Sequence, residues 1–237
     1  MKLLLFDIDG TLVLTGGAGV RAMNRAFEAV FGVPEAFHGI PMAGRTDPAI
    51  LAEACARAGF SLSRDEIARF ERRYYTALDE EMLAPPPPPA DPAHSRSFKG
   101  VLPGVPALVD RLAGDAGVFL ALLTGNYAAA ARTKLAHFDL WRQFRCGAFG
   151  EDADPRHALV PVAVARAREA GCQAVAPSDV VIVGDTPRDV DCALRAGVSI
   201  VAVATGGYDT AMLRAAGADT VFESLADTET VTRALKS

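Results

Sequence analysis

The chain has 237 residues, of which 50% are apolar and 22% charged, a soluble, globular composition large enough for one large domain or two small ones. Its formal net charge of −5 argues against a nucleic-acid-binding protein, although a metal ion and a few local donors can still make one pocket attract an anion. No apolar run approaches the roughly 18 residues of a membrane span. The N-terminal run ends at Asp7, too early for a signal peptide, so we expect a cytoplasmic protein.

Short apolar runs rich in β-forming residues alternate with helical patterns along most of the chain. The expected strands are residues 3–6, 118–123, 146–150, 180–183, 199–204 and 220–222. The expected helices are residues 105–112, 127–138, 158–170, 188–196 and 210–215. Continuous apolar strands suit a parallel sheet that is buried on both faces, so the alternation predicts a doubly wound α/β domain.

The stretch from about Gly16 to Ala84 breaks this alternation, because its patterns are mainly helical. Asp47 followed by Pro48 predicts an N-cap, and Ser63 with Glu66 predicts a capping box that opens a long helix. The stretch is too long for a crossover, so we expect a helical cap domain at residues 15–95, inserted into a core formed by residues 1–14 and 96–237. The prolines at residues 85–89 are expected to stiffen the return linker.

The four cysteines carry no sign of a metal or redox site. They are scattered, without a Cys-x-x-Cys pair, at Cys55, Cys146, Cys172 and Cys192. We therefore expect small buried thiols rather than a zinc site or a disulfide framework.

Polar residues follow four of the expected strands, at Asp7, Thr124, Glu151 and Asp185. Because ligands of doubly wound folds bind at the carboxyl ends of the strands, we expect a site there.

The segment Asp7-Ile8-Asp9-Gly10-Thr11 is the sharpest signal for chemistry. Two carboxylates at i and i+2 on an extended chain point to the same side, and Gly10 lets the backbone turn away from them. They repel each other, so they need a cation between them or a raised pKa on one. Mg²⁺ would let Asp7 stay ionised as ligand and nucleophile, while Asp9 could hold a proton for a leaving group. The alternative is a simple turn cluster.

A second acidic segment, Gly184-Asp185-Thr186-Pro187-Arg188-Asp189, follows another expected strand. Asp185 is placed as a metal ligand opposite Asp7, and Thr186 and Pro187 are expected to start a helix. Asp189 then falls in the first helical turn. It belongs either to the metal shell or only to the favourable end of the helix dipole.

A phosphoryl site also needs donors and a basic group. Thr124-Gly125-Asn126 offers a hydroxyl, a small residue and backbone N–H groups at a helix start, although, taken alone, ordinary helix capping by Thr or Asn explains it better. Arg156 is the preferred basic residue because it follows a strand and precedes a helix. Lys134 is the rival, expected on a solvated helix face.

In order along the chain, these segments resemble the motifs of the haloacid dehalogenase superfamily. They are Asp7-x-Asp9-Gly10-Thr11, Thr124-Gly125-Asn126, a basic residue, and Gly184-Asp185-x-x-x-Asp189. The resemblance covers almost the whole chain, including a helical cap after the first strand. It looks closest to the phosphoglycolate phosphatase and β-phosphoglucomutase branch.

The resemblance implies that Asp7 attacks phosphorus and forms an aspartyl-phosphate, while Asp9 protonates the leaving oxygen and then activates water. It implies Mg²⁺ held by Asp7, the backbone carbonyl of Asp9, and Asp185, with phosphoryl oxygens held by Thr124 and the next amide. Dehalogenases of the family lack the second acid, so Asp9 favours phosphate esters. The family's usual basic residue is a lysine, so Arg156 is a departure, since a guanidinium does not reproduce a point charge.

The cap segment Gly44-Arg45-Thr46-Asp47 is the expected substrate-facing loop, by resemblance to relatives. Arg45 could meet a second anionic group of the substrate, or it could be an exposed arginine beside a helix cap. We expect a small phosphorylated metabolite, phosphoglycolate by default, and a monomer or homodimer.

Two other functions stay open. A phosphosugar mutase would need a cap that excludes water and rebinds a bisphosphate. A phosphoacceptor signalling module would place its aspartate in a mid-chain strand and lack a cap, so the position of Asp7 argues against it.

Overall fold

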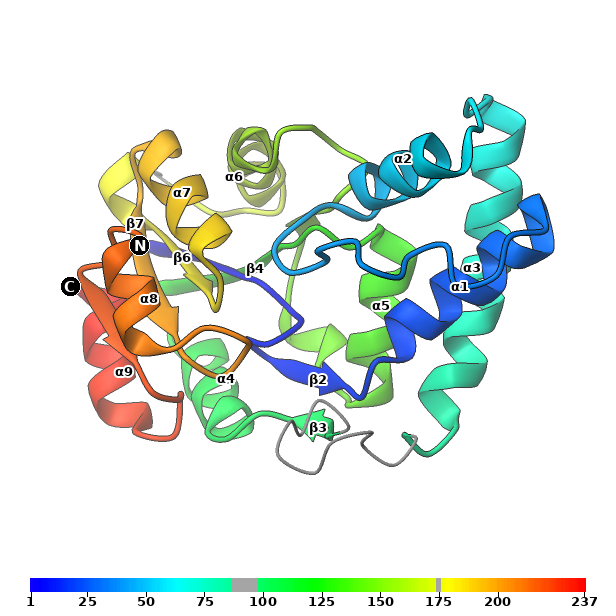
Figure 1. Cartoon of the computed structure of the whole chain (residues 1–237). Coiled ribbons are helices and arrows are strands. Elements are labelled where there is room, and N and C mark those ends of the chain that lie inside the picture. The colour runs from blue at the N-terminus through cyan, green and yellow to red at the C-terminus, as the bar shows by residue number, and fades with distance from the viewer. Residues whose placement is uncertain (87–97, 174–175) are drawn as a thin grey trace.

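The computed structural model describes residues 1–86, 98–173 and 176–237. Its centre is a parallel sheet of six strands in the order β5-β4-β1-β6-β7-β8, with helices on both faces (Figure 1). The strands are β1 (Lys2–Phe6), β4 (Val118–Leu123), β5 (Gly147–Ala148), β6 (Val180–Gly184), β7 (Ser199–Val203) and β8 (Thr220–Phe222). This confirms the predicted doubly wound α/β fold.

Alternating side chains of the central strand enter two different apolar clusters. Leu4 and Phe6 pack with the helices at Val105–Ala113, Ala128–His137 and Thr228–Lys236, whereas Leu3 and Leu5 pack with those at Leu159–Glu169 and Pro187–Ala196. All four side chains are fully buried, and each contributes about 1.5–3 kcal/mol of transfer free energy. The helices around the sheet are α4 (Val105–Ala113), α5 (Ala128–His137), α6 (Leu159–Glu169), α7 (Pro187–Ala196), α8 (Thr210–Ala215) and α9 (Thr228–Lys236). The sequence patterns predicted all of these helices except α9.

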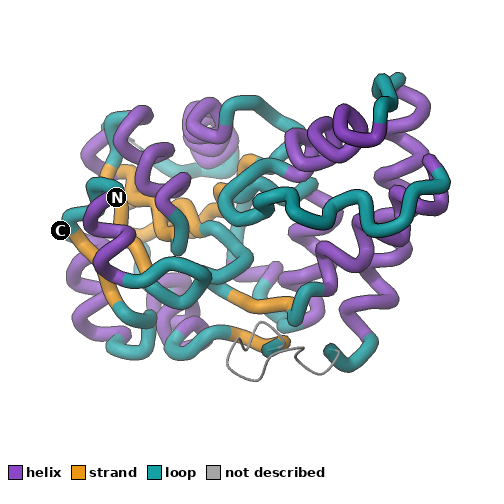
Figure 2. Tube along the Cα trace, viewed as in Figure 1, coloured by secondary structure: helices purple, strands orange, loops and turns teal. Residues whose placement is uncertain are grey.

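The insertion between β1 and β4 lies beside the sheet (Figures 1 and 2). It contains α1 (Ala18–Phe31), α2 (Asp47–Ala58) and α3 (Arg64–Leu83), joined to the core through an antiparallel pair, β2 (Val13–Thr15) and β3 (Lys99–Val101). The three helices share an apolar cluster, which Tyr127 and Ala130 of α5 also enter. The pair β2–β3 was not predicted. The expected linker prolines at 87–89 and the boundary near residue 95 lie outside the described residues.

Helix starts follow the expected chemistry, with one correction. The Ser63 hydroxyl and the Glu66 carboxylate form the predicted capping box of α3. Thr186 caps α7, with Pro187 at its first position, as predicted. The N-cap of α2 is Thr46 rather than Asp47, because the Thr46 hydroxyl accepts the Ala49 amide.

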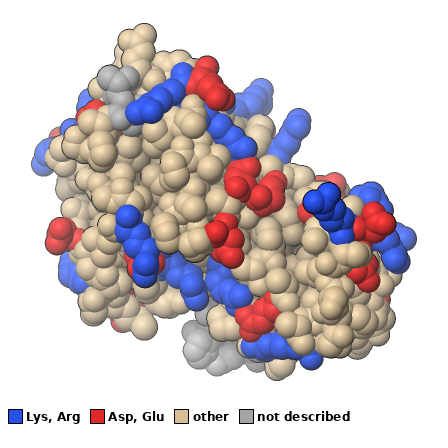
Figure 3. All heavy atoms as spheres, turned by 90° about the horizontal axis from the view of Figure 1, so that it is seen from above, with Lys and Arg blue, Asp and Glu red and all other residues tan. Residues whose placement is uncertain are grey.

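All four cysteines are free thiols, and Cys55, Cys172 and Cys192 are buried as expected. Among the described residues, no helix is long and apolar enough to span a bilayer. Acidic and basic side chains are interspersed on the face seen from above (Figure 3).

Candidate active site

The candidate site lies at the edge of the sheet where successive strands are added first on one side of β1 and then on the other. The central strand β1 has β4 on one side and β6 on the other, so the chain after each strand reaches the same edge. Asp7 directly follows β1, and its amide donates to the Val183 carbonyl of β6 at 2.9 Å. The backbone then turns at Gly10, whose φ is +88°, and a Cβ there would overlap the Asp185 carboxylate. Gly10 is therefore required by both the turn and the close approach.

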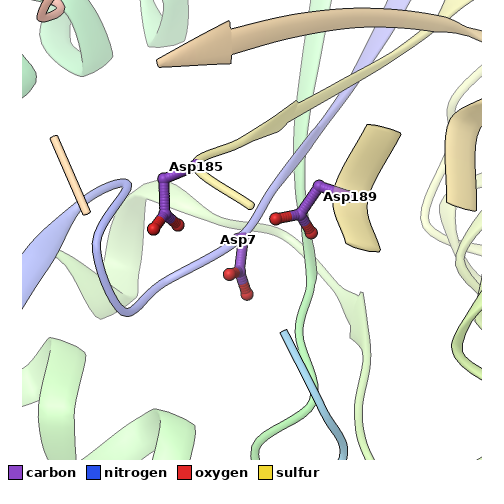
Figure 4. A group of neighbouring side chains, drawn as sticks. All are labelled: Asp7, Asp185 and Asp189. Carbon is purple, nitrogen blue, oxygen red and sulfur yellow. The ribbon is translucent and has the colours of Figure 1, made fainter. Parts of the chain in front are cut away.

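Three buried carboxylates converge at this edge (Figure 4). Asp7 comes from the end of β1, Asp185 from the end of β6, and Asp189 from the first turn of α7. One oxygen of each lies within 4.8 Å of the others. The sequence predicted the proximity of Asp7 and Asp185, and it left the place of Asp189 open.

The Asp185 carboxylate is held tightly but has no cationic partner among the described residues. Thr11 Oγ1 donates to Asp185 Oδ1 at 3.0 Å, and a Cβ on Gly206 would overlap the carboxylate. Burial raises the pKa of Asp185 well above its ordinary value, and the charges of Asp189 and Asp7 raise it further. A buried carboxylate of this kind favours either a proton or a bound cation.

Asp189 supports its surroundings with both oxygens. Its Oδ2 accepts the Thr186 amide at 3.0 Å and the Thr186 hydroxyl at 2.7 Å, which completes the N-terminal capping box of α7. Its Oδ1 accepts from Arg156 Nη2 at 2.6 Å. Asp189 therefore holds both the start of α7 and the Arg156 guanidinium in place.

Arg156 lies in a short 3₁₀ turn, Arg156–Ala158, ahead of α6 and reaches the nucleophile candidate. Its Nη2 is 3.1 Å from Asp7 Oδ1, and its Nε is buried without a partner among the described residues. Burial alone would lower the pKa of Arg156, but the carboxylates of Asp189 and Asp7 raise it above its ordinary value. In turn, burial raises the pKa of Asp7 to about 6, with Arg156 opposing that shift.

Lys134 corrects one expectation, because it is buried rather than solvated. Its Nζ lies 2.6 Å from Asp9 Oδ2 and donates to Asn126 Oδ1 at 2.6 Å. The reason is that α5 lies between the sheet and the helices of the insertion, where its buried face includes Ala130, Ala131 and Lys134. Ala131 and Ala130 precede Lys134 by three and four residues, and this spacing was the signal in the sequence that could have identified this face. The site thus has two basic groups, with Arg156 beside Asp7 and Lys134 beside Asp9.

The segment after β4 connects these groups. Asn126 Nδ2 donates to Asp9 Oδ2 at 2.8 Å and to the buried Thr124 Oγ1 at 2.8 Å. Glu151, also expected at the site, does not join the acidic cluster. Its carboxylate accepts the Ala128 amide at 2.9 Å, which satisfies a free N–H at the start of α5.

The loop of residues 44–47 rests directly on the segment after β4. The Asp47 amide donates to the Gly125 carbonyl at 2.7 Å, and Asp47 Oδ2 accepts the Tyr127 amide at 2.9 Å. A Cβ on Gly125 would overlap the Arg45 carbonyl, so only glycine allows this approach. The Arg45 guanidinium pairs with Glu53 of α2. No local pattern in the sequence indicates the contact made by Asp47.

The donor set at the acidic cluster consists of oxygens only, which suits a hard cation such as Mg²⁺. Within the cluster, Arg156 pairs with Asp7 and Asp189, whereas Asp185 remains without a counter-charge among the described residues; Lys134 pairs with Asp9 beside it. The residues therefore fit a divalent cation between Asp7 and Asp185.

Comparison with known proteins shows the family to which the chain belongs. The family model described as haloacid dehalogenase-like hydrolase matches residues 4–194, from the central strand through α7. The chain belongs to this family. Both acidic segments of the chain lie within the matched residues. The resemblance seen in the sequence is therefore confirmed.

Curated relatives of this hydrolase are modestly similar over most of its length. One, a phosphoglycolate phosphatase of Agrobacterium fabrum, is 26% identical over 220 residues, covering 89% of this chain and 84% of the relative. Another, a phosphoglycolate phosphatase of Mesorhizobium japonicum, is 28% identical over 215 residues, covering 87% and 84%.

Solved structures share the fold of the hydrolase. CbbY of Rhodobacter sphaeroides, solved in complex with phosphate, superposes with a TM-score of 0.70 at 21% identity and covers 96% of each chain. Proteins named for phosphoglycolate phosphatase and for β-phosphoglucomutase are both among the structural neighbours. At these identities the likeness shows the fold alone.

Proposed function

We propose that the protein is a Mg²⁺-dependent phosphomonoester hydrolase that acts on a small phosphorylated metabolite through an aspartyl-phosphate. One observation carries this proposal: two carboxylates at the end of the central strand, Asp7 and Asp9, each have their own basic partner. Two acids in different surroundings can take different tasks in one reaction. The family membership and the phosphatase relatives support the same conclusion.

In the first step, the Asp7 carboxylate attacks phosphorus, and the bond from phosphorus to the ester oxygen breaks. Asp9 gives a proton to the leaving oxygen, which departs as an alcohol. In the second step, Asp9 takes a proton from water, which attacks the phosphorus of the aspartyl-phosphate and releases inorganic phosphate and free Asp7.

Other groups would bind the phosphoryl oxygens or hold the acids in place. Arg156 is proposed to balance charge on Asp7 and phosphate, while Thr124 and the Gly125 amide hold phosphoryl oxygens. Asn126 and Lys134 keep the Asp9 carboxylate in position through the contacts at 2.8 and 2.6 Å. When bound by Asp7, Asp185 and the Asp9 carbonyl, Mg²⁺ would supply positive charge against the phosphoryl oxygens. Asp189 is proposed at the edge of that shell.

The substrate proposed first is phosphoglycolate, the compound for which both curated relatives are named. We expect a cytoplasmic enzyme that acts as a monomer or homodimer.

The alternative function is that of a phosphosugar mutase of the β-phosphoglucomutase type. Mg²⁺-dependent release of phosphate from an aryl phosphate, without any sugar-phosphate cosubstrate, would favour the hydrolase.

The decisive variant is Asp7→Asn, which keeps the size of the side chain but removes the nucleophile. We expect phosphate release over a panel of phosphomonoesters to fall by at least about 10³-fold, with an unchanged melting temperature. Wild-type enzyme with a chelator should be equally inactive until Mg²⁺ is restored. Normal turnover by Asp7→Asn would refute the proposed mechanism.

A further inference from the structure

The N-terminus of α1 faces the same site, from the side of the insertion. Its N-cap is Gly17, no side chain caps it, and no acidic residue lies in its first turn. The first-turn amides of an α-helix have no partner within the helix and carry partial positive charge. The position that a Cβ of Gly19 would take is 3.6 Å from Lys134 Nζ. The helix start is thus next to a basic residue already placed in the site.

The hydroxyl of a buried tyrosine lies near the same position, on α3. Tyr74 is 1% exposed, and its Oη lies 4.0 Å from the Cβ position of Gly19. It has no hydrogen-bond partner among the described residues, although its ring packs against Phe70, Tyr75 and Tyr127. The Oη is not among the fully enclosed polar atoms without a partner, so an incoming ligand atom can reach it and accept its proton.

Lys134 also limits how far this position lies from the reacting atoms. The same Nζ that is 3.6 Å from the Cβ position of Gly19 is 2.6 Å from Asp9 Oδ2, the proposed proton donor. A single ammonium group therefore spans the distance between them. A leaving group that reaches from Asp9 to Gly19 must be only a few atoms long.

We propose that the α1 N-terminus, the Tyr74 hydroxyl and Lys134 form a subsite for a carboxylate on the leaving group. The preferred substrates are then phosphate esters of short hydroxy acids. All three elements offer hydrogen-bond donors, which suits an anion rather than a neutral methyl or methylene group. Gly19 leaves room for that anion because it has no side chain.

Two charged groups of the insertion near this position have partners of their own. Asp47, whose charge also acts on Tyr74, directs its Oδ2 to the Tyr127 amide. Arg45, which was a candidate to bind a second anionic group of the substrate, forms an ion pair with Glu53. The subsite rests on the proposed phosphatase function and names the substrate class for it.

The test compares two substrates that differ only at the proposed contact, 2-phosphoglycolate and ethyl phosphate, in which a methyl group replaces the carboxylate. Both are assayed with Mg²⁺ on wild type, Tyr74→Phe and the matched control Tyr75→Phe. Wild type should prefer phosphoglycolate by about 100-fold in kcat/KM, and Tyr74→Phe should reduce that preference about tenfold, mainly through KM. Tyr75→Phe should keep the wild-type preference.

A second variant, Gly19→Ala, fills the subsite from the other side. The added Cβ meets Lys134 and Tyr74 at ordinary contact distances, so the fold should tolerate it. The preference for phosphoglycolate should again fall, by about tenfold or more. Each readout is a ratio between two substrates, which a general loss of folded protein does not change.

Two results would overturn this inference alone: hydrolysis of both esters without preference, or equal losses on both in Tyr74→Phe and Gly19→Ala. A wild-type enzyme that hydrolyses neither ester nor any aryl phosphate in the presence of Mg²⁺ would overturn the proposed function, and the subsite with it.

Discussion

At the scale of single residues, the acids of the site are held by a few neighbouring groups. Asp9 depends on Lys134 and Asp7 on Arg156, at 2.6 and 3.1 Å. Within the described part of the chain, the side-chain partner of Asp185 is the Thr11 hydroxyl, which is why a cation fits beside it. Removing Arg156 would leave the buried Asp7 carboxylate uncompensated, which costs far more than the loss of a solvated contact.

Asp47 leads to a prediction about stability and pH. Burial raises the pKa of Asp47 to about 7, from 3.8 for the ordinary side chain. The folded protein therefore holds this proton more tightly than the unfolded chain does. The resulting stabilisation is complete below about pH 4 and is lost as the pH rises through about 7.

The variant Asp47→Asn keeps an acceptor for the Tyr127 amide but does not titrate. Relative to this variant, the wild type should lose on the order of 2 kcal/mol of unfolding free energy between pH 5 and pH 8. Urea denaturation at several pH values measures the difference. A gap that stays constant across this range would contradict the assigned shift.

At the scale of elements, one motif appears at two helix starts with different consequences. The capping box of Ser63 and Glu66 opens α3 on an exposed surface. The capping box of Thr186 and Asp189 opens α7 in the acidic cluster, where Asp189 also binds Arg156. Local sequence determines both caps in the same way, whereas the fold decides which of them affects chemistry.

This contrast predicts different effects of the same type of substitution. Ser63→Ala and Thr186→Ala each lose a helix cap, so each should lower the free energy of unfolding by about 1 kcal/mol. Only Thr186→Ala should also lower kcat, by about tenfold or more, because it releases Asp189 and through it Arg156. Denaturation and phosphate-release assays on both variants check this. Equal activities would show that the cap of α7 does not position the guanidinium.

At the scale of the whole molecule, the insertion contacts the core through its loop as well as through its helices. The loop of residues 44–47 exchanges hydrogen bonds with Gly125 and Tyr127, directly beside Thr124 and Asn126. The proposed phosphate-binding segment is therefore covered by the insertion. Covering of this kind excludes water and strengthens electrostatic interactions at the reacting atoms.

Gly125→Ala tests this contact. Because the new Cβ would overlap the Arg45 carbonyl, the loop should be displaced from the core while the sheet stays folded. We expect activity to fall by at least about tenfold and the radius of gyration measured by small-angle X-ray scattering to increase.

Gly32→Ala is a control for the glycine substitution itself, since its Cβ would meet nothing within 4 Å. Its φ of +74° costs some stability, but the scattering profile should not change. An unchanged profile for Gly125→Ala would contradict the proposed seating of the loop.

The strands, most core helices and the acidic residues at the strand ends follow from the amino-acid sequence alone, because periodicity and capping act over a few neighbouring residues. The proximity of Asp7 and Asp185 follows as well, since parallel strands bring their carboxyl ends to one edge. Which other side chains complete the site depends on the tertiary structure. Lys134 on α5 is buried because the insertion covers that helix, Glu151 turns to the start of α5, and Tyr74 reaches Gly19 from α3. Those placements depend on how separate elements pack: the spacing on α5 indicates a buried face, but no local pattern identifies the element that covers it.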